Sequence, residues 1–432
     1  MSLTGTPPPK GWEWIPLKHV TTVLRRGTTP NYADDGPVRA ISQASNQPGG
    51  LDWSRTRFHE HDGSTKKIKG ILQPGDILIN STGRGTLGRV GYFSGGPDGK
   101  LCMADAHVTV ARTDANRWDP RFAFYYLSSD LFYSYIYSAL VIGATNQIEL
   151  SGDRLASAPV ILPPLDKQRH IAGFLDAELT RIDQVSSLFK ESDWLAQERK
   201  QALRASTLEQ LAQDHGEVPL RRFVTKIEQG ESPQCESSRA GDSEWGVLKL
   251  SSIKDGTFSS DENKRLPEGI RPEPRFAVRT GDLLVTRANT PELVGDTAVV
   301  TDAYHRRLLP DLIYRVGLTD ALLPEFAAIT LRGPRVRGLI QAVARGSSQS
   351  MVKLRGEDIR AWPIPRAPVD VQRLVVSSLE EKFTQLAELR AKVSHQLSLL
   401  AERRQALITA AVTGQLDVTT AGRAGKVAAS GV

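Results

Sequence analysis

The chain has 432 residues, of which 40% are hydrophobic and 24% charged, with a formal net charge of +6 and an isoelectric point of about 9.2. This length and composition predict a globular protein of two or three domains. No apolar run is long enough to cross a bilayer, and the first residues lack the basic and apolar regions of a secretory signal. The two cysteines, Cys102 and Cys235, favour a reducing compartment, so we expect a cytoplasmic protein without membrane contact.

An internal repeat organises the chain. Glu198, Gln201 and Leu203 recur as Glu402, Gln405 and Leu407, each 204 positions later. A repeat of this length indicates two copies of one structural unit. We therefore predict five segments: a globular domain over 12–165, a long helix over 166–214, a second globular domain over 215–368, a second long helix over 369–417 and a disordered tail over 418–432.

Each globular domain shows the same order of local signals. In the first domain these are a Gly/Pro turn at 27–30, a strand after Gly75-Asp76, a short helix entered through Pro120, a polar loop at 143–147 and a proline-rich exit at 159–164. The second domain repeats them at 230–233, Gly281-Asp282, Pro324, 346–350 and 363–368. The spacing between copies varies slightly, which indicates shared elements joined by loops of different length.

The two long helices carry an approximate heptad of apolar residues, for example Val375, Leu379, Phe383 and Leu386. At 1.5 Å per residue each would be roughly 65 Å long. A helix with one apolar stripe needs a partner, and each helix is the natural partner of the other. The predicted fold class is α+β, with two similar mixed α/β globular domains separated by two long antiparallel, coiled-coil-like helices.

Charged and polar loop residues indicate a polyanionic partner. Arg84 and Arg89 flank the glycine-rich stretch 83–88, and Arg287 with Asn289 lie at the corresponding place in the second domain. Arginine pairs with guanine, Asn and Gln pair with adenine, and lysine neutralises phosphate. The candidate DNA contacts are Thr28, Ser42, Gln43, Asn46, Ser81, Arg84, Arg89, Asn146, Gln147, Lys249, Ser251, Arg287, Asn289, Arg345, Ser347, Gln349 and Lys353.

Two other functions remain open at this point. Residues 83–88 match the G-x-G-x-x-G pattern of nucleotide-binding loops, although the following residues predict a strand rather than the helix that a pyrophosphate site requires. A coiled-coil scaffold that does not read DNA is the second alternative. We find no nucleophile–base set, no metal-ligand spacing and no P-loop, so we expect a chain without catalytic residues or a bound metal.

The chain resembles the specificity (S) subunit of type I restriction–modification enzymes over about residues 12–417. The segments that carry the resemblance are the two Gly-Asp strands, the exits 162–171 and 365–373, and the ending 402–418. The second exit departs from the usual Pro-Pro-Leu-x-Glu-Gln form, and the first has Lys167 where glutamate is usual.

The resemblance implies a non-catalytic subunit of a DNA adenine methyltransferase and endonuclease complex that acts in phage defence. Each globular domain would read one half of a bipartite double-stranded DNA target, and the helices would fix the gap. Two methyltransferase (M) subunits would dock, with two restriction (R) subunits in complexes that contain them; these partners, not this chain, would hold S-adenosylmethionine, ATP and Mg. Implied contacts with M subunits are Gln168, Ile171, Glu198, Arg199, Gln201, Gln372, Glu402, Arg403 and Gln405.

Overall fold

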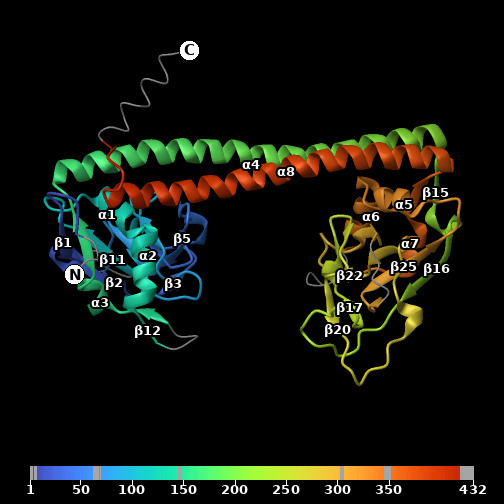
Figure 1. Ribbon diagram of the computed structural model, residues 1–432, viewed down its shortest axis with the longest axis horizontal. Coiled ribbons are helices and arrows are strands. Elements are labelled where there is room, and N and C mark those ends of the chain that lie inside the picture. Colours follow the sequence, from blue (N-terminus) through green and yellow to red (C-terminus); the bar gives the residue numbers. More distant parts are fainter. Residues whose placement is uncertain are drawn as a thin grey trace, which may run out of the picture. The chain divides into compact units, whose positions relative to one another are not determined.

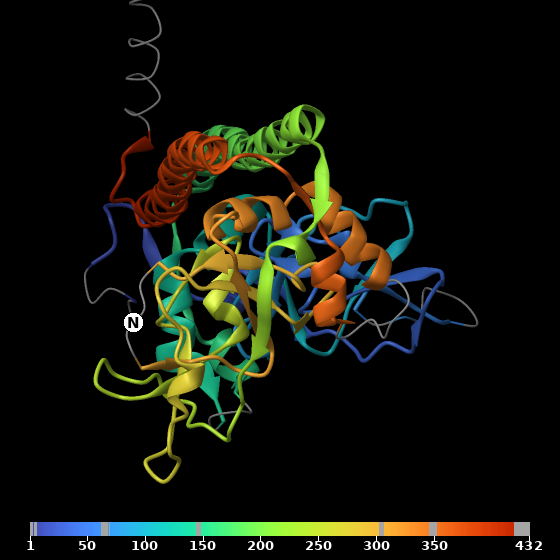
Figure 2. The ribbon, with the colours of Figure 1, turned by 90° about the vertical axis from the view of Figure 1, so that its right-hand side faces the viewer.

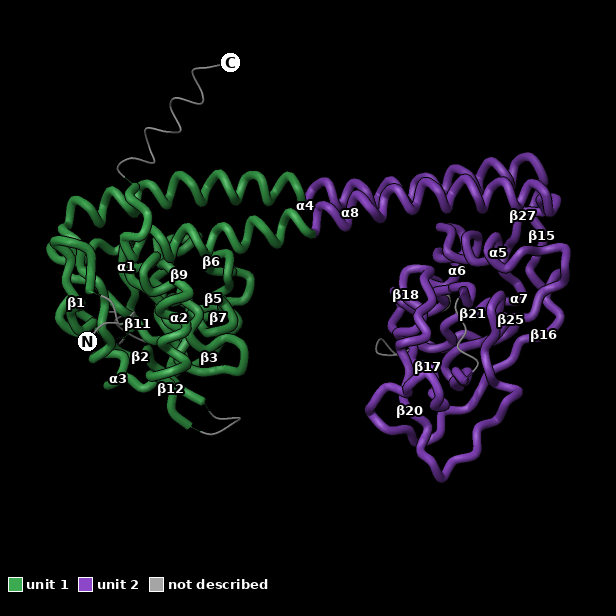
Figure 3. Tube along the Cα trace, in the orientation of Figure 1, with its two compact units in different colours: residues 1–189, 395–432 green, residues 190–394 purple. Residues whose placement is uncertain are grey.

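The computed structural model divides into two units, residues 1–189 with 395–432 (unit 1) and residues 190–394 (unit 2) (Figure 3). The structure describes residues 3, 7–61, 68, 70–143, 148–301, 306–344 and 352–418. The tail predicted to be disordered, 418–432, lies outside the described residues apart from Val418. Each unit consists of a mixed α/β globule together with one part of each of the two long helices (Figure 1).

The elements of unit 1 are mostly short strands. The strands are β1 Glu13–Pro16, β2 Thr21–Arg26, β3 Tyr32–Ala33, β4 Val38–Ile41, β5 Asn46–Gln47, β6 Gly50–Leu51, β7 Arg57–His59, β8 Ile77–Asn80, β9 Val90–Tyr92, β10 Leu101–Ala104, β11 Val108–Thr113, β12 Val141–Ile142, β13 Glu149–Leu150 and β14 Pro159–Leu162. The helices are α1 Pro120–Leu127, α2 Asp130–Tyr135, a π-helical turn Ile136–Leu140, α3 Gly152–Ala156 and the start of α4 Leu165–His215.

Unit 2 repeats this plan. Its strands are β15 Glu217–Pro219, β16 Val224–Gln229, β17 Gly246–Leu248, β18 Ile253–Lys254, β19 Thr257–Phe258, β20 Asn263–Arg265, β21 Leu283–Thr286, β22 Ala288–Asn289, β23 Thr297–Val299, β24 Arg307–Leu308, β25 Ile313–Leu318, β26 Val352–Lys353 and β27 Pro363–Pro365. Its helices are α5 Pro324–Leu331, α6 Pro334–Ala344, α7 Gly356–Ala361 and the start of α8 Val369–Val412.

The sheets confirm the duplication. Unit 1 contains an antiparallel sheet in the order β2-β11-β8-β9, and unit 2 contains its counterpart in the order β16-β25-β21-β23. In each globule the first strand pairs with the last in an antiparallel two-stranded sheet, β1 with β14 and β15 with β27. The two sequence copies therefore fold into the same central sheet.

The central strand β8 has apolar residues on both faces, which places it inside a layered core. Ile77 and Ile79 pack with Phe122 of α1 and Leu175 of α4, whereas Leu78 packs with residues of the second sheet, β10-β4-β7-β3. Alternate side chains of a strand point to opposite faces, so the continuous apolar run buries both. In unit 2, Leu283 and Val285 of β21 separate from Leu284 in the same way.

The long helices pair side by side within each unit (Figures 1 and 2). In unit 1, Arg404 of α8 bonds Asp183 of α4 at 2.6 Å. In unit 2, Arg390 of α8 bonds Asp193 of α4 at 2.7 Å, and the Lys200 ammonium lies 5.2 Å from the ring centre of Phe383. As the residue numbers of these contacts increase along α4, those of their partners decrease along α8, so the helices are antiparallel. The predicted fold class is confirmed.

Candidate nucleic-acid interface

The Gly-Asp strands are a structural framework shared by both units. The buried Asp76 carboxylate accepts the backbone N–H of Gln73 at 2.7 Å and pairs with Arg112 of β11 at 2.7 Å. Asp282 accepts the N–H of Arg279 at 2.9 Å and pairs with Arg315 of β25 at 3.3 Å. Each aspartate thus closes its own turn and ties β8 or β21 to the neighbouring strand, which explains why the motif is repeated.

A tight turn follows β8 and forms the first candidate DNA-contacting feature. The N–H groups of Thr86 and Leu87 both donate to the Gly83 carbonyl, at 3.1 and 3.0 Å, and Gly88 N–H donates to Asn80 at 2.8 Å. Gly88 has φ +81°, a conformation that side chains rarely adopt. The turn leads directly into β9, so the helix N-terminus that a pyrophosphate site needs is missing and the nucleotide alternative is not favoured.

The same turn follows β21, although the sequence comparison missed it. Leu293 and Val294 donate to the Thr290 carbonyl at 3.0 and 2.9 Å, and Gly295, with φ +73°, donates to Thr286 at 2.9 Å. Gly295 therefore corresponds to Gly88. Aligning the strands β8 and β21 does not align these two glycines, because the turn of unit 2 lies one residue further from its strand.

The side chains at the two turns differ. Arg84 is exposed, and its guanidinium makes no hydrogen bond or ion pair within the described part of the chain. Arg89 is instead used inside the fold, donating to the Asn46 carbonyl at 2.9 Å and to Gln47 at 3.2 Å. In unit 2 the turn exposes half of Leu293 (50%). Of the two arginines predicted here, only Arg84 is free to meet a phosphate or a base.

The two residues predicted in the corresponding stretch of unit 2 are engaged internally. The Arg287 guanidinium donates to the Asp311 carbonyl at 3.2 Å and lies 5.7 Å from the centre of the Tyr314 ring. The Asn289 side-chain oxygen accepts the N–H of Thr290 at 2.9 Å, and Asn289 pairs with Val352 in the β22–β26 ladder. Neither presents the free side chain that the sequence suggested.

Two predicted DNA contacts are buried, and burial contradicts that role. The Asn46 amide donates to the Leu78 carbonyl at 3.2 Å and to the Asn80 side chain at 3.1 Å. Ser81 shares a 2.5 Å hydrogen bond with Thr109. Both residues hold β8 in place. The short polar side chains that indicated DNA contact are instead satisfied inside the protein.

Three further candidates from unit 1 are half-buried. The Gln43 side chain accepts the Thr82 hydroxyl at 3.1 Å. Ser42 accepts the N–H of Ala44 at 3.2 Å, and the backbone N–H of Thr28 donates to Ala104 at 3.1 Å. Their DNA contacts stay predictions.

In unit 2, two candidates meet at one carboxylate. The Lys249 ammonium lies 3.7 Å from Glu262, and the Ser251 hydroxyl donates to the same carboxylate at 2.5 Å. The Ser251 hydrogen bond and the Lys249 charge lower the pKa of Glu262. Lys353 is exposed on β26.

The polar loops predicted to contact DNA fall outside the described residues, namely Asn146, Gln147, Arg345, Ser347 and Gln349. Their described flanks lie beside the turns. In unit 1, Leu150 of β13 donates to the Ser81 carbonyl at 2.8 Å. In unit 2, β26 pairs with β22, and Leu354 donates to Arg287 at 2.8 Å. The described residues that follow each loop therefore lie against the backbone between the central strand and its turn.

At the base of each long helix, a predicted partner-binding glutamine is buried. The Gln168 oxygen accepts the N–H of Asp119 at 2.7 Å, and its amide donates to Arg117 and Pro163 carbonyls at 2.9 and 2.7 Å. Gln372 makes the corresponding bonds to Leu323, Ala321 and Ala367, each at 2.9 Å. These residues fasten α4 and α8 to their globules, and Ile171, only 3% exposed, belongs to the core. The prediction that these three bind a partner is wrong.

The remaining predicted partner contacts lie on the long helices and are mostly exposed to solvent. Glu198, Arg199 and Gln201 on α4 are exposed, as are Glu402 and Arg403 on α8, whereas Gln405 is half-buried. Among the described residues there is no cluster of His, Cys, Asp and Glu suited to a metal, and no described helix is long and apolar enough to cross a membrane.

The chain thus contains two similar globules whose surface turns carry different side chains. A buried glutamine of one long helix fastens each globule, and the two helices pair antiparallel. This arrangement defines a tandem recognition protein. Residues 9–184 match the family model of the type I restriction modification DNA specificity domain. The chain is 25% identical over 428 residues to the type I restriction enzyme EcoKI specificity subunit of Escherichia coli K12, covering 94% of this chain and 90% of the relative.

Other comparisons agree. The StySPI specificity subunit of Salmonella potsdam is 21% identical over 424 residues, covering 94% of this chain and 90% of the relative. A solved structure of a type I restriction–modification system, 19% identical, shares the fold with a TM-score of 0.68 over 95% of this chain and all of the other. Together these similarities support a specificity subunit of a type I restriction–modification system.

Proposed function

We propose that this chain reads a bipartite double-stranded DNA target, with one unit for each half-site. The observation that carries the proposal is the contrast between a shared backbone and different exposed side chains. The turn is held by the same hydrogen bonds in both units, yet its side chains differ: Arg84 of unit 1 corresponds to Pro291, and the exposed Leu293 of unit 2 corresponds to Thr86. A rigid turn with exchangeable side chains can read a different sequence in each half-site.

The proposal assigns the chain no catalytic step. Adenine methylation, with S-adenosylmethionine, and any ATP- and Mg-dependent cleavage would occur on methyltransferase and restriction subunits in the cytoplasm. The paired helices α4 and α8 would set the length of the unread gap. The test is to express the chain with a methyltransferase subunit, map methylated adenines by sequencing, and footprint the complex. Two protected segments with a fixed gap support the proposal, whereas one continuous or sequence-independent footprint contradicts it.

The partner surface is indicated by exposed residues that are identical in the two copies. Leu195, Glu198, Arg199 and Ala202 on α4 recur as Leu399, Glu402, Arg403 and Ala406 on α8. Their spacing places each set on one helix face, and all eight side chains are exposed, with Leu195 51% and Leu399 42% accessible. Packing within the chain does not require this identity, so we assign each stripe to one copy of the same methyltransferase subunit.

The stripes can be tested one at a time. Leu195→Asp and Leu399→Asp each replace the exposed leucine of one stripe by a charge, and each should remove one methyltransferase copy from the complex. Native mass spectrometry would count the copies, and the double variant should bind none. Leu374→Asp provides a control, since this leucine is 72% exposed on α8 outside both stripes. Retention of both copies by the double variant would exclude the stripes as the docking surface.

A further inference from the structure

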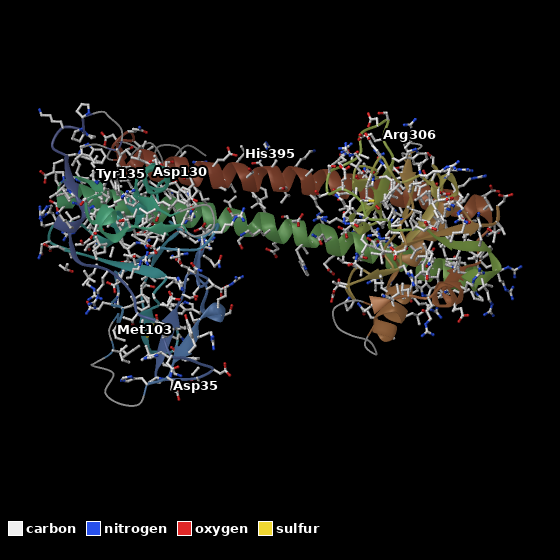
Figure 4. All side chains as sticks on the ribbon, turned by 90° about the horizontal axis from the view of Figure 1, so that it is seen from below. Asp35, Met103, Asp130, Tyr135, Arg306 and His395 are labelled. Carbon is white, nitrogen blue, oxygen red and sulfur yellow. The ribbon has the colours of Figure 1, made fainter. Side chains whose placement is uncertain are left out.

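Unit 1 exposes a pair of tyrosines beside its turn. Tyr133 on α2 and Tyr137 in the following π-helical turn are 46% and 41% exposed, and their ring centres lie 5.1 Å apart. Asp130 and Tyr135, labelled in Figure 4, mark the two ends of α2. Two adjacent exposed aromatic rings leave a large apolar surface in water, which is more often seen where a ligand covers it.

The tyrosine pair is braced against the turn that carries Arg84. The Tyr137 hydroxyl donates to the Leu87 carbonyl at 3.1 Å. Gly88 lies so close that an added Cβ would be 3.4 Å from the Tyr133 ring and from Ile136. The backbone between the rings enters a π-helical turn at Ile136–Leu140, a rare conformation that is frequent at functional sites. Arg84 and the two rings therefore share one rigid support.

The folding of the turn does not require aromatic residues. Ile340 packs on Gly295 in unit 2 as Ile136 packs on Gly88 in unit 1, which aligns Tyr133 with Arg337 and Tyr137 with Gln341. The Arg337 guanidinium turns inward and donates to Val294, Pro291 and Glu292 carbonyls, at 2.6, 3.2 and 2.8 Å. Unit 2 thus braces the same turn with a half-buried arginine, and neither Arg337 nor Gln341 is aromatic.

We infer that Tyr133 and Tyr137 contact the DNA in the half-site of unit 1, packing their rings against base edges or thymine methyl groups in a groove of the duplex. The inference rests on the proposed function. Duplex DNA fits this surface because the turn that accepts the Tyr137 hydrogen bond also carries Arg84, an exposed cation without an ion pair among the described residues. Ring packing adds base contact without charge, so it acts independently of phosphate neutralisation.

The test compares Tyr133→Ala and Tyr133→Phe in the complete complex with its methyltransferase subunits. Tyr133→Ala should weaken binding to the intact target roughly ten- to hundredfold, and Tyr133→Phe should retain most of the affinity, because the ring makes the contact. The dependence of affinity on salt should not change, since no phosphate contact is lost. Gln341→Ala, at the exposed position of unit 2 that corresponds to Tyr137, should leave binding unchanged.

The outcomes separate this inference from the proposed function. If the wild-type complex protects no pair of half-sites, the proposed function fails. If the wild type protects both half-sites and Tyr133→Ala binds with unchanged affinity, the aromatic contact is wrong while the proposed function stands. At a concentration of the variant that saturates the target DNA, loss of protection at the half-site of unit 2 would also overturn the inference, because the contact belongs to unit 1 alone. Unchanged melting of Tyr133→Ala would show that its effect does not come from unfolding.

Discussion

Units 1 and 2 share their backbone framework but differ where each globule meets the long helices. In unit 1, Arg121 of α1 pairs with Asp176 of α4, and Tyr125 donates to the same carboxylate at 2.6 Å. The corresponding residues of unit 2 are Glu325 and Glu380, two carboxylates. Burial and the Glu325 charge raise the pKa of Glu380. An attractive contact in one copy has become a repulsive one in the other.

A second difference lies deeper in the same junction. Ile408 of α8 is 4% exposed within the core of unit 1, whereas its counterpart on α4 is Arg204, only 2% exposed. Burial, with the nearby Arg332 charge, lowers the pKa of Arg204 to about 10, and its guanidinium rests 5.3 Å from the centre of the Phe383 ring. The hydrogen bonds of the backbone framework are therefore the same in both copies, whereas the side-chain contacts between globule and helix differ.

The largest effect is expected from adding a methyl group at the glycine that packs against backbone in the first turn of each unit. These substitutions test whether the shared framework excludes a side chain at the same place in both units. A Cβ on Gly27 would overlap the Ala104 carbonyl oxygen, and one on Gly230 would overlap the Leu309 carbonyl oxygen. Backbone cannot move aside as a flexible side chain can. We therefore expect Gly27→Ala and Gly230→Ala each to reduce stability by about 3 kcal/mol or more, measured by urea unfolding.

Matched controls exist in each unit. Gly49 and Gly269 have no atom within 4 Å of an added Cβ, so Gly49→Ala and Gly269→Ala should be nearly neutral. Hydrogen exchange should show lost protection only in the unit that carries the substitution. Equal loss in both units would mean that they do not behave as separate copies of the framework.

Arg84 tests the difference in DNA contact. Arg84→Ala should lower affinity by about 1–3 kcal/mol if the guanidinium reads a base, through the half-site of unit 1 alone. Binding assays with one half-site scrambled at a time would show this, because the affinity difference between the intact first half-site and a scrambled one should be smaller for the variant than for the wild type. Arg169→Ala, which removes an exposed arginine from the first turn of α4, should not have this effect. An equal loss at both half-sites would contradict the assignment.

The fold could be predicted because its signals are local and repeated. The Gly-Asp strands, the prolines that begin α1 and α5, and the apolar stripe of the long helices each leave a pattern in adjacent residues. Not every apolar residue of α4 faces the protein interior, since Val185 is 41% exposed. The apolar stripe of α4 is looser than that of α8, so heptad spacing alone did not fix the buried face there.

The candidate site was predicted less well because side-chain direction depends on tertiary contacts. Polar residues of the kind usually found on surfaces turn out to bond buried groups of distant segments. They are Asn46, Ser81, Gln168 and Gln372. Only the folded chain shows that the Asp119 N–H needs the Gln168 oxygen. The Tyr133 and Tyr137 spacing of four residues is visible in the sequence, yet helical aromatics at that spacing are usually core residues.

The smallest expected effect tests the repulsive junction of unit 2. Because the pKa of Glu380 is raised in the folded protein, the folded state binds its proton more tightly than the unfolded state. Stability therefore falls as pH rises from the ordinary glutamate pKa through the raised value, and the penalty persists above it. Glu325→Arg removes the like charge and recreates the pairing of Arg121 with Asp176, so it should stabilise unit 2 by about 0.5–1 kcal/mol at neutral pH.

The pH dependence distinguishes this explanation from a general effect of added positive charge. The gain from Glu325→Arg should shrink as pH falls and Glu380 becomes protonated, and it should be reduced by salt because the pair is partly exposed. Glu268→Arg makes the same charge change at an exposed position with no ion pair among the described residues, and it should show neither trend. A gain that is constant from pH 4 to pH 8 would mean that the Glu325–Glu380 repulsion does not weaken unit 2.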